Sequence, residues 1–199
     1  MSTIRILLGI LCLVAIGCGT EPGSGVLEQS NSSLRGTKQS AIQILKGDCF
    51  VLRNDAFRER ILAVASSQIG VREATGNNDG PQVEAYLKVT NLPKGNPWCA
   101  AFVSWVFRQA GFALPRTAWS PALFPLARQT LSPKPADVLG IYSIRLKRIA
   151  HAGLVEQRQN NWIISIEGNT NVDGSREGDG VYRKRRHVKT IAKFADWVR

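Results

Sequence analysis

The sequence has few of the side chains that bind transition metals. Its 199 residues contain two histidines and four cysteines. No two cysteines have the close spacing of a structural zinc site, and His151 and His187 lie far apart in the chain. We therefore expect no metal ion and no other cofactor.

The chain also lacks an apolar run long enough to cross a bilayer. Its longest, Ile6–Ile16, suits the h-region of a secretory signal, and small residues follow it. Ala15-Ile16-Gly17 before Cys18 is similar to a bacterial lipobox, although alanine replaces the usual leucine. We expect residues 1–17 to be a signal peptide and Cys18 to carry a lipid. Ordinary signal cleavage at the same bond is the alternative, and both export the protein.

Aromatic residues are absent from residues 19–46, which are rich in Gly, Ser, Gln, Thr and Asn. Such a segment buries too little apolar surface to fold alone, so residues 18–53 are predicted to be a flexible tether. The folded domain is expected over residues 54–199. The chain carries 26 Lys+Arg against 15 Asp+Glu, a net charge of +11, which favours anionic partners. Export argues against nucleic acid as that partner.

A cysteine lies at the start of the clearest helical pattern. Pro97 follows a turn and suits a first helical position, and Gly111 suits the C′ position. The first turn of a helix lowers the pKa of a thiol, which favours Cys99 as a nucleophile over a merely buried cysteine. The apolar stripe between the two ends is Trp98, Ala101, Phe102, Trp105 and Val106.

Two further helices are expected before this one. The first should begin at Asn54 or Asp55, either of which can cap a helix, and end at Gly70. The second should begin at Pro81. The polar loop 75–81 between them is interpreted as a turn, because the spaced acidic ligands of an EF-hand calcium loop are absent.

Strand patterns dominate the second half, after a proline-rich segment with one helical turn near residues 122–127. Short polar connections predict an antiparallel meander, and helices followed by strands indicate an α+β domain. The strand candidates are Val138–Ser143, Ala150–Glu156, Trp162–Glu167 and Gly180–Arg185, with a possible fifth near Val188–Ala192.

His151 is the better base for Cys99. His187 follows Arg183-Lys184-Arg185-Arg186, whose positive charge would oppose its protonation. His151 opens a small apolar strand in which Gly153 lets another group approach closely. The next strand ends in Glu167-Gly168-Asn169, and either polar side chain can accept a hydrogen bond from the imidazole.

At these residues the sequence resembles the CHAP domain (cysteine- and histidine-dependent amidohydrolase/peptidase) of the papain-like superfamily. The resemblance extends from about residue 56 to 190. Its residues are Trp98-Cys99-Ala100-Ala101-Phe102-Val103 with Trp105, His151-Ala152-Gly153 and Glu167-Gly168-Asn169, supported by Asn78-Asp79-Gly80-Pro81 and Gly178-Asp179-Gly180-Val181-Tyr182.

The resemblance implies an α+β, papain-like fold in which the cysteine helix packs on an antiparallel sheet. It implies Cys99 as nucleophile, His151 as base and Glu167 as orienting acid, with Asn169 assisting. It also implies peptidoglycan as substrate, cleaved at an amide bond. We expect the protein to be a monomer. We expect Trp98 and Asn78 to contact that substrate.

The sequence is compatible with more than one scissile bond and more than one function. The bond could be the muramoyl–alanine amide or a peptide bond of the stem or cross-bridge, in the cell's own wall or a competitor's. An inactive wall-binding lipoprotein on the same scaffold is the alternative function, and a basic protein that only docks on anionic surfaces is a weaker one. Cys49 has no assigned role; we expect it at the domain edge rather than in a disulfide with Cys99.

Overall fold

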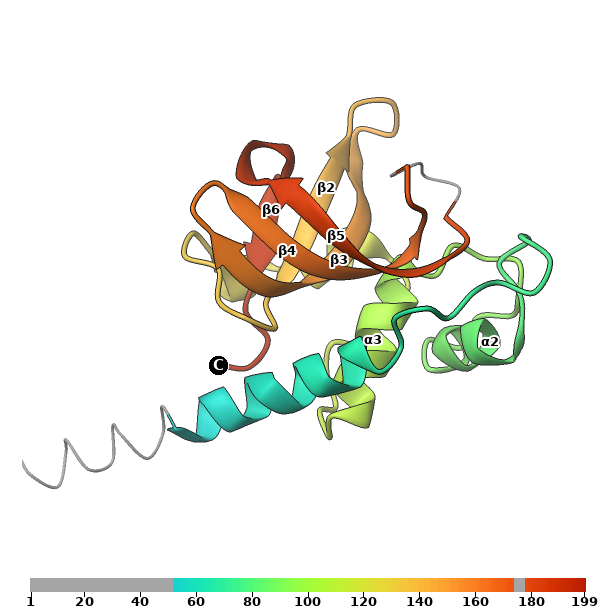
Figure 1. Ribbon diagram of the computed structural model, residues 1–199, viewed down its shortest axis with the longest axis horizontal. Coiled ribbons are helices and arrows are strands. Elements are labelled where there is room, and N and C mark those ends of the chain that lie inside the picture. The colour runs from blue at the N-terminus through green and yellow to red at the C-terminus, as the bar shows by residue number, and fades with distance from the viewer. Residues whose placement is uncertain (1–51, 174–177) are drawn as a thin grey trace, which may run out of the picture. The chain divides into compact units, whose positions relative to one another are not determined.

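A six-stranded antiparallel sheet forms the centre of the computed structural model, which describes residues 52–173 and 178–199 (Figure 1). The strand order is β1-β6-β2-β3-β4-β5, and every neighbouring pair is antiparallel. The strands are β1 (Gln129–Thr130), β2 (Val138–Ser143), β3 (Arg148–Gln159), β4 (Trp162–Thr170), β5 (Gly180–His187) and β6 (Lys193–Ala195).

Four strands that are consecutive in both the chain and the sheet, β2 to β5, form the predicted meander. The predicted fifth strand near Val188–Ala192 is wrong: residues Val188–Thr190 form a short 3-10 helix. The strand comes later, as β6, and pairs with both β1 and β2. The sequence pattern missed it because a three-residue strand is too short to show alternation.

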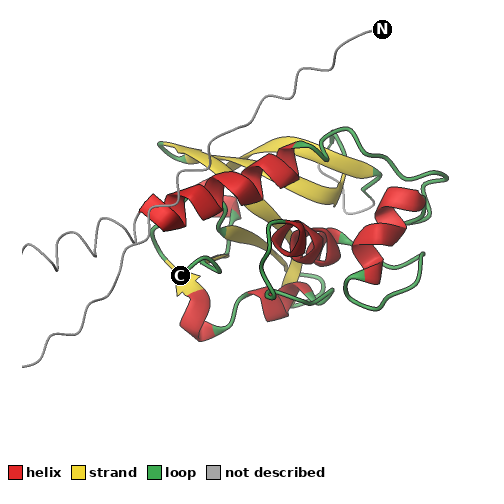
Figure 2. Cartoon of the chain, turned by 90° about the horizontal axis from the view of Figure 1, so that it is seen from below, coloured by secondary structure: helices red, strands yellow, loops and turns green. Residues whose placement is uncertain are grey.

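The helices lie on one side of this sheet, as the two views show (Figures 1 and 2). A helix spans residues 52–66, followed by α2 (Pro81–Lys88) and α3 (Cys99–Gln109). The α3 helix packs on β3 and β4. The single helical turn expected near residues 122–127 is two 3-10 helices, Ser120–Leu123 and Leu126–Arg128. The α+β class is confirmed.

Two predicted helix starts differ from the structure. The first helix is already formed at residue 52, so Asn54 and Asp55 lie inside it and do not cap it. The third begins at Cys99 with Trp98 as its N-cap, so Pro97 precedes the helix rather than opening it. Gly111 follows the C-cap with a φ of 89°, the left-handed conformation expected at C′.

The predicted signal peptide, the lipid on Cys18, most of the tether and Cys49 lie outside the described residues. They stay predictions. None of the helices within residues 52–173 and 178–199 is long and apolar enough to cross a membrane.

The main core lies between the helices and one face of the sheet. Because side chains alternate along a strand, Val138 and Leu154 face the helices while their neighbours Leu139 and Val155 face the opposite side. The opposite face carries a smaller cluster, completed by Ile163 and Ile191.

Buried ion pairs join the first helix to the residues that directly precede β2 and directly follow β6. Arg58 Nη1 lies 2.7 Å from Asp137 Oδ1, and its Nη2 lies 2.8 Å from Asp196 Oδ2. All three side chains are almost completely buried. Removing one partner of such a group leaves buried charge without compensation, so these contacts hold the helix in place.

Candidate active site

Cys99 is the first residue of α3, and its side chain borders the main cavity of the described chain. It is a free thiol and only 5% exposed. The position follows from the local sequence, because the helix starts directly after the turn at residues 94–96 and Pro97. The first N–H groups of a helix have no intrahelical acceptor, so the thiol lies in a positive field.

His151 lies on β3 and contacts both Cys99 and Glu167. Its Nε2 donates a hydrogen bond to Glu167 Oε2 at 2.8 Å. The thiol of Cys99 and the imidazole also interact by a hydrogen bond and by charge. Since Nε2 is occupied by the carboxylate, Nδ1 is the nitrogen available to the thiol. The imidazole therefore joins a sulfur on a helix to a carboxylate on the neighbouring strand.

The thiol and the imidazole shift each other's acidity. Burial raises the pKa of Cys99, but the hydrogen bond and charge of His151, with smaller help from Ser120 and Ala152, lower it to about 7. Burial lowers the pKa of His151, while Cys99 and Glu167 raise it to about 10. Both directions favour a thiolate–imidazolium pair near neutral pH.

Glu167 is completely buried and fully hydrogen-bonded. Arg186 donates to both oxygens, and Ser165 Oγ donates to Oε1 at 2.6 Å. Burial alone would raise the pKa of this carboxyl, but Arg186 and His151 hold it well below its usual range. Glu167 is thus an anion that fixes the His151 ring.

Asn169 takes part in a different set of contacts. Its Oδ1 accepts from the Trp98 backbone N–H at 3.1 Å, and its Nδ2 donates to Asn78 Oδ1 and to the Gly178 carbonyl, both at 3.1 Å. Among the described residues it makes no hydrogen bond to His151. Asn169 therefore ties the start of α3 to the loop that contains Asn78.

A register shift in β4 explains why Glu167 and Asn169 point to different partners. In a regular strand, residues two apart share a face. The pairing with β5 slips between Glu167 and Thr170, and Asn169 has a φ of 55°. The irregularity turns Asn169 towards α3 and leaves Glu167 beside the imidazole.

Trp98, predicted to contact substrate, does not border the cavity. Its side chain is completely buried and stacks on Tyr86 with ring centroids 5.4 Å apart. Its Nε1 donates to Glu73 Oε1 at 2.8 Å. The indole is a core residue that supports the start of α3. Asn78, in contrast, does border the cavity.

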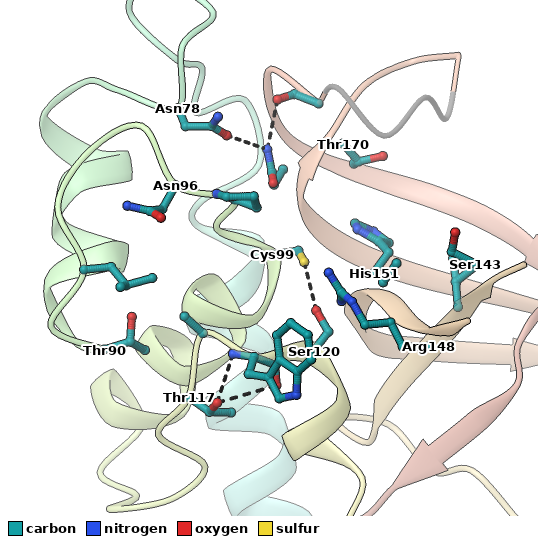
Figure 3. A pocket seen from close by; sticks show the side chains of 18 of the residues that line it. Asn78, Thr90, Asn96, Cys99, Thr117, Ser120, Ser143, Arg148, His151 and Thr170 are labelled. Atoms are coloured by element: carbon teal, nitrogen blue, oxygen red, sulfur yellow. Dashed lines mark hydrogen bonds between the residues drawn. The ribbon is translucent and has the colours of Figure 1, made fainter. Parts of the chain in front are cut away.

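The thiol and imidazole face a cavity of about 910 Å³. Figure 3 shows Cys99 between His151 on one side and Ser120 and Thr117 on another, with Asn78 and Asn96 further along the cavity. The lining also includes Glu73, Arg116, Trp119, Tyr142, Arg148, Asp179 and Arg186. Within the described ranges no cluster of His, Cys, Asp and Glu is arranged to hold a metal ion.

Sequence reasoning missed Ser120 and Arg186. Ser120 Oγ lies 3.4 Å from Cys99 Sγ, but it sits in a proline-rich segment without periodicity, so no pattern indicated it. Arg186 was interpreted only as part of a basic run. All four residues of this run are basic, so the sequence does not single out Arg186; in the structure Arg183 and Arg185 are exposed while Lys184 and Arg186 are partly buried.

The loop before α2 is a turn held together by hydrogen bonds between Thr75 and Asp79. Asp79 accepts hydrogen bonds from the backbone N–H of Thr75 at 2.9 Å and from its hydroxyl at 2.8 Å. These bonds lower the pKa of Asp79. The interpretation of residues 75–81 as a turn agrees with these contacts.

No family model matches the sequence, and no curated protein matches it. Several solved structures resemble the chain at low identity. RipB, a peptidoglycan hydrolase from Mycobacterium tuberculosis, is 16% identical, with a TM-score of 0.46 over 83% of this chain and 86% of its own. RipA, a resuscitation-promoting-factor-interacting protein, is 16% identical, with a TM-score of 0.43 over 72% of this chain and 62% of its own. Ly7917 is 15% identical, with a TM-score of 0.41 over 69% of this chain and 60% of its own. The chain therefore spans less than two thirds of RipA and of Ly7917.

Proposed function

We propose that this protein is a cysteine-dependent hydrolase that cleaves an amide bond of peptidoglycan. One observation carries the proposal: Cys99, His151 and Glu167 are in contact, in that order, at the wall of a large cavity. The three supply a nucleophile, a base and a group that orients the base, which is the set that acyl transfer by a thiol needs.

The reaction proceeds in two halves. The Cys99 thiolate attacks the carbonyl carbon, a C–S bond forms, and the carbonyl oxygen becomes an oxyanion beside the first N–H groups of α3. The oxyanion collapses, the C–N bond breaks, and the His151 imidazolium gives its proton to the leaving amine. Water then attacks the thioester and loses a proton to His151. The C–S bond breaks, which releases the acid and restores the ion pair.

Glu167 keeps the imidazole in one orientation throughout both halves. It stays ionised, because Arg186 donates to both carboxylate oxygens, including Oε2, which also accepts from His151. The negative charge favours the imidazolium form before attack and again after hydrolysis of the thioester. Asn169 acts on the nucleophile instead: it accepts a hydrogen bond from the backbone N–H of Trp98 and so holds the residue directly before Cys99.

The choice of peptidoglycan rests on the resemblance to CHAP domains and on the physical character of the chain. A net charge of +11 attracts the anionic polymers of a cell wall. The predicted signal peptide would deliver the domain to that wall. We further propose that Cys18 is lipidated, so that a Cys18→Ser variant would be released from membranes with its hydrolase activity intact.

The test is hydrolysis of purified cell wall in a zymogram, followed by mass spectrometry of the released fragments. Wild-type protein should clear the wall, and Cys99→Ala and His151→Ala should each remove the activity while thermal unfolding stays close to wild type. The masses would identify the bond. Clearing by the Cys99→Ala variant would overturn the thiol mechanism, and binding without clearing by wild type would favour an inactive wall-binding protein.

A further inference from the structure

Arg148 lines the cavity that Cys99 also borders. It is the first residue of β3, and in Figure 3 its side chain points towards Cys99 and Ser120. Its guanidinium carbon lies 4.1 Å from the ring centroid of Trp119. Trp119 directly precedes Ser120, whose hydroxyl is 3.4 Å from Cys99 Sγ, so the stack anchors the guanidinium on the part of the cavity wall that carries Ser120.

This guanidinium has hydrogen-bonding capacity left over. Its one hydrogen bond among the described residues is from Nη1 to the Ile149 carbonyl at 3.0 Å. No carboxylate of the described chain lies within ion-pair distance of it, whereas Arg183 and Arg186 each pair with one and Arg58 pairs with two. A guanidinium carries several N–H donors in a planar fork that fits a carboxylate.

The stack on Trp119 also fixes the plane of the guanidinium. Contact with an aromatic face restricts the long side chain, so less conformational entropy is lost when an anion binds. The charge is not cancelled by the wall around it. The cavity residue Arg116 is also cationic. Of the two carboxylates of the described chain that line the cavity, Glu73 accepts hydrogen bonds from Trp98 Nε1 and Asn78 N, and Asp179 accepts one from the Tyr182 hydroxyl.

We propose that Arg148, held against Trp119, binds a carboxylate of the substrate beside the scissile amide. The inference rests on the proposed hydrolase function and deepens it by defining the substrate class. The favoured peptides carry a free carboxylate on the Trp119 side of the cleaved bond. The same peptides with that group converted to a carboxamide are poor substrates.

The first test probes the subsite without any hydrolysis. Iodoacetate and iodoacetamide alkylate the same thiolate and differ mainly in the carboxylate, so the ratio of their rates at Cys99 cancels changes in thiolate population. Arg148→Gln should lower the iodoacetate-to-iodoacetamide ratio about tenfold, as expected for the loss of a charge-assisted contact. Arg148→Lys, which retains the charge but not the fork, should give an intermediate ratio.

Arg145→Gln is the matched control. Arg145 lies on the turn between β2 and β3, is exposed and does not border the cavity, so this variant removes the same net charge from the same hairpin. Its ratio should equal that of wild type. Equal ratios in wild type, Arg148→Gln and Arg148→Lys would overturn the proposal. A drop in Arg145→Gln as large as that in Arg148→Gln would also overturn it, because the ratio would then depend only on the net charge of the protein.

The second test compares stem peptides with a free carboxylate and with its carboxamide. Wild type should hydrolyse the carboxylate form at least about tenfold faster in kcat/KM, and Arg148→Gln should lose that preference. Hydrolysis of both peptides at equal rates would overturn the carboxylate subsite and leave the hydrolase intact. If neither peptide is hydrolysed but the alkylation ratio responds to Arg148, the proposed function fails and the anion subsite stands.

Discussion

Arg186 donates two hydrogen bonds to Glu167, from Nε to Oε1 at 2.9 Å and from Nη2 to Oε2 at 2.6 Å. Oε2 is the same atom that accepts from His151, so the carboxylate is shared between a guanidinium and the imidazole. Arg186 therefore keeps Glu167 ionised in a fully buried position. It also takes part of the negative charge that would otherwise act on His151 alone.

Glu167→Gln should narrow the pH range of Cys99 reactivity. In wild type, alkylation by iodoacetamide should rise as the thiol loses its proton near its pKa of about 7. Hydrolysis should fall again as His151 loses its proton near its pKa of about 10. Without the carboxylate the imidazolium is less stable, so the His151 pKa falls and the Cys99 pKa rises.

Both limbs of the pH–rate profile should therefore move inwards in Glu167→Gln, with hydrolysis reduced by about tenfold to a hundredfold. The loss should be smaller than in Cys99→Ala or His151→Ala, because glutamine still accepts a hydrogen bond. The check is the rate of hydrolysis measured from about pH 5 to about pH 11, a range that brackets the pKa values of Cys99 and His151. An unchanged pH profile would exclude Glu167 as the partner of His151.

Removal of the Asn169 amide should lower the rate without moving the His151 limb. The φ of Asn169 is 55°, so glycine removes the side chain without backbone strain. Asn169→Gly loses the acceptor of the Trp98 N–H, and hydrolysis should fall about tenfold because the start of α3 is less well positioned.

Asn78→Gly is the control for this loop, since Asn78 has a φ of 54° and shares only one hydrogen bond with Asn169. It should have the smaller effect. A downward shift of the alkaline limb in Asn169→Gly would instead assign the orienting role to Asn169.

Gly153→Ala should disturb the carboxylate directly. A Cβ at this position would lie 2.5 Å from Glu167 Cγ, and Glu167 is held by three hydrogen-bonding side chains and cannot easily move. We expect a loss of about 1–3 kcal/mol in the free energy of unfolding and a shifted pH profile for alkylation.

Gly140→Ala is the matched variant on β2. Its Cβ would lie 2.6 Å from the Phe124 ring, away from the catalytic carboxylate, so urea unfolding should show a loss of stability with the pH profile kept. If both variants keep that profile, Gly153 has no particular importance for Glu167.

Arg58→Ala should destabilise the fold by about 3–5 kcal/mol. The change leaves Asp137 and Asp196 buried without their cation. Urea denaturation measures the loss. Arg60→Ala on the same helix, at an exposed position, should cost less than about 1 kcal/mol. Similar values for the two variants would mean that the buried pair contributes no more than a surface charge.

The elements that carry the site could be predicted from local pattern. The helical spacing from Trp98 to Val106 placed Cys99 in a first turn, and alternation marked β2 to β5 within a few residues. These features are local: helix and strand periods repeat within a few residues, so neighbouring residues encode them. The choice of His151 over His187 also came from sequence neighbours, because a run of cations next to His187 opposes protonation.

The partners of those residues depend on tertiary structure. Sequence spacing left Glu167 and Asn169 equivalent, since residues two apart on a strand share a face. The register shift at Asn169 breaks that equivalence, and it arises from pairing with β5.

Other site residues come from strands and loops that are distant in the chain, namely Arg186, Ser120 and Arg148. Trp98 was expected at the substrate and lies in the core, because Tyr86 and Glu73 from earlier segments enclose it. The local sequence determined which elements form and which side chains they carry. Packing and strand register decided which of those side chains meet, because contacts between distant segments form only when the whole chain is folded.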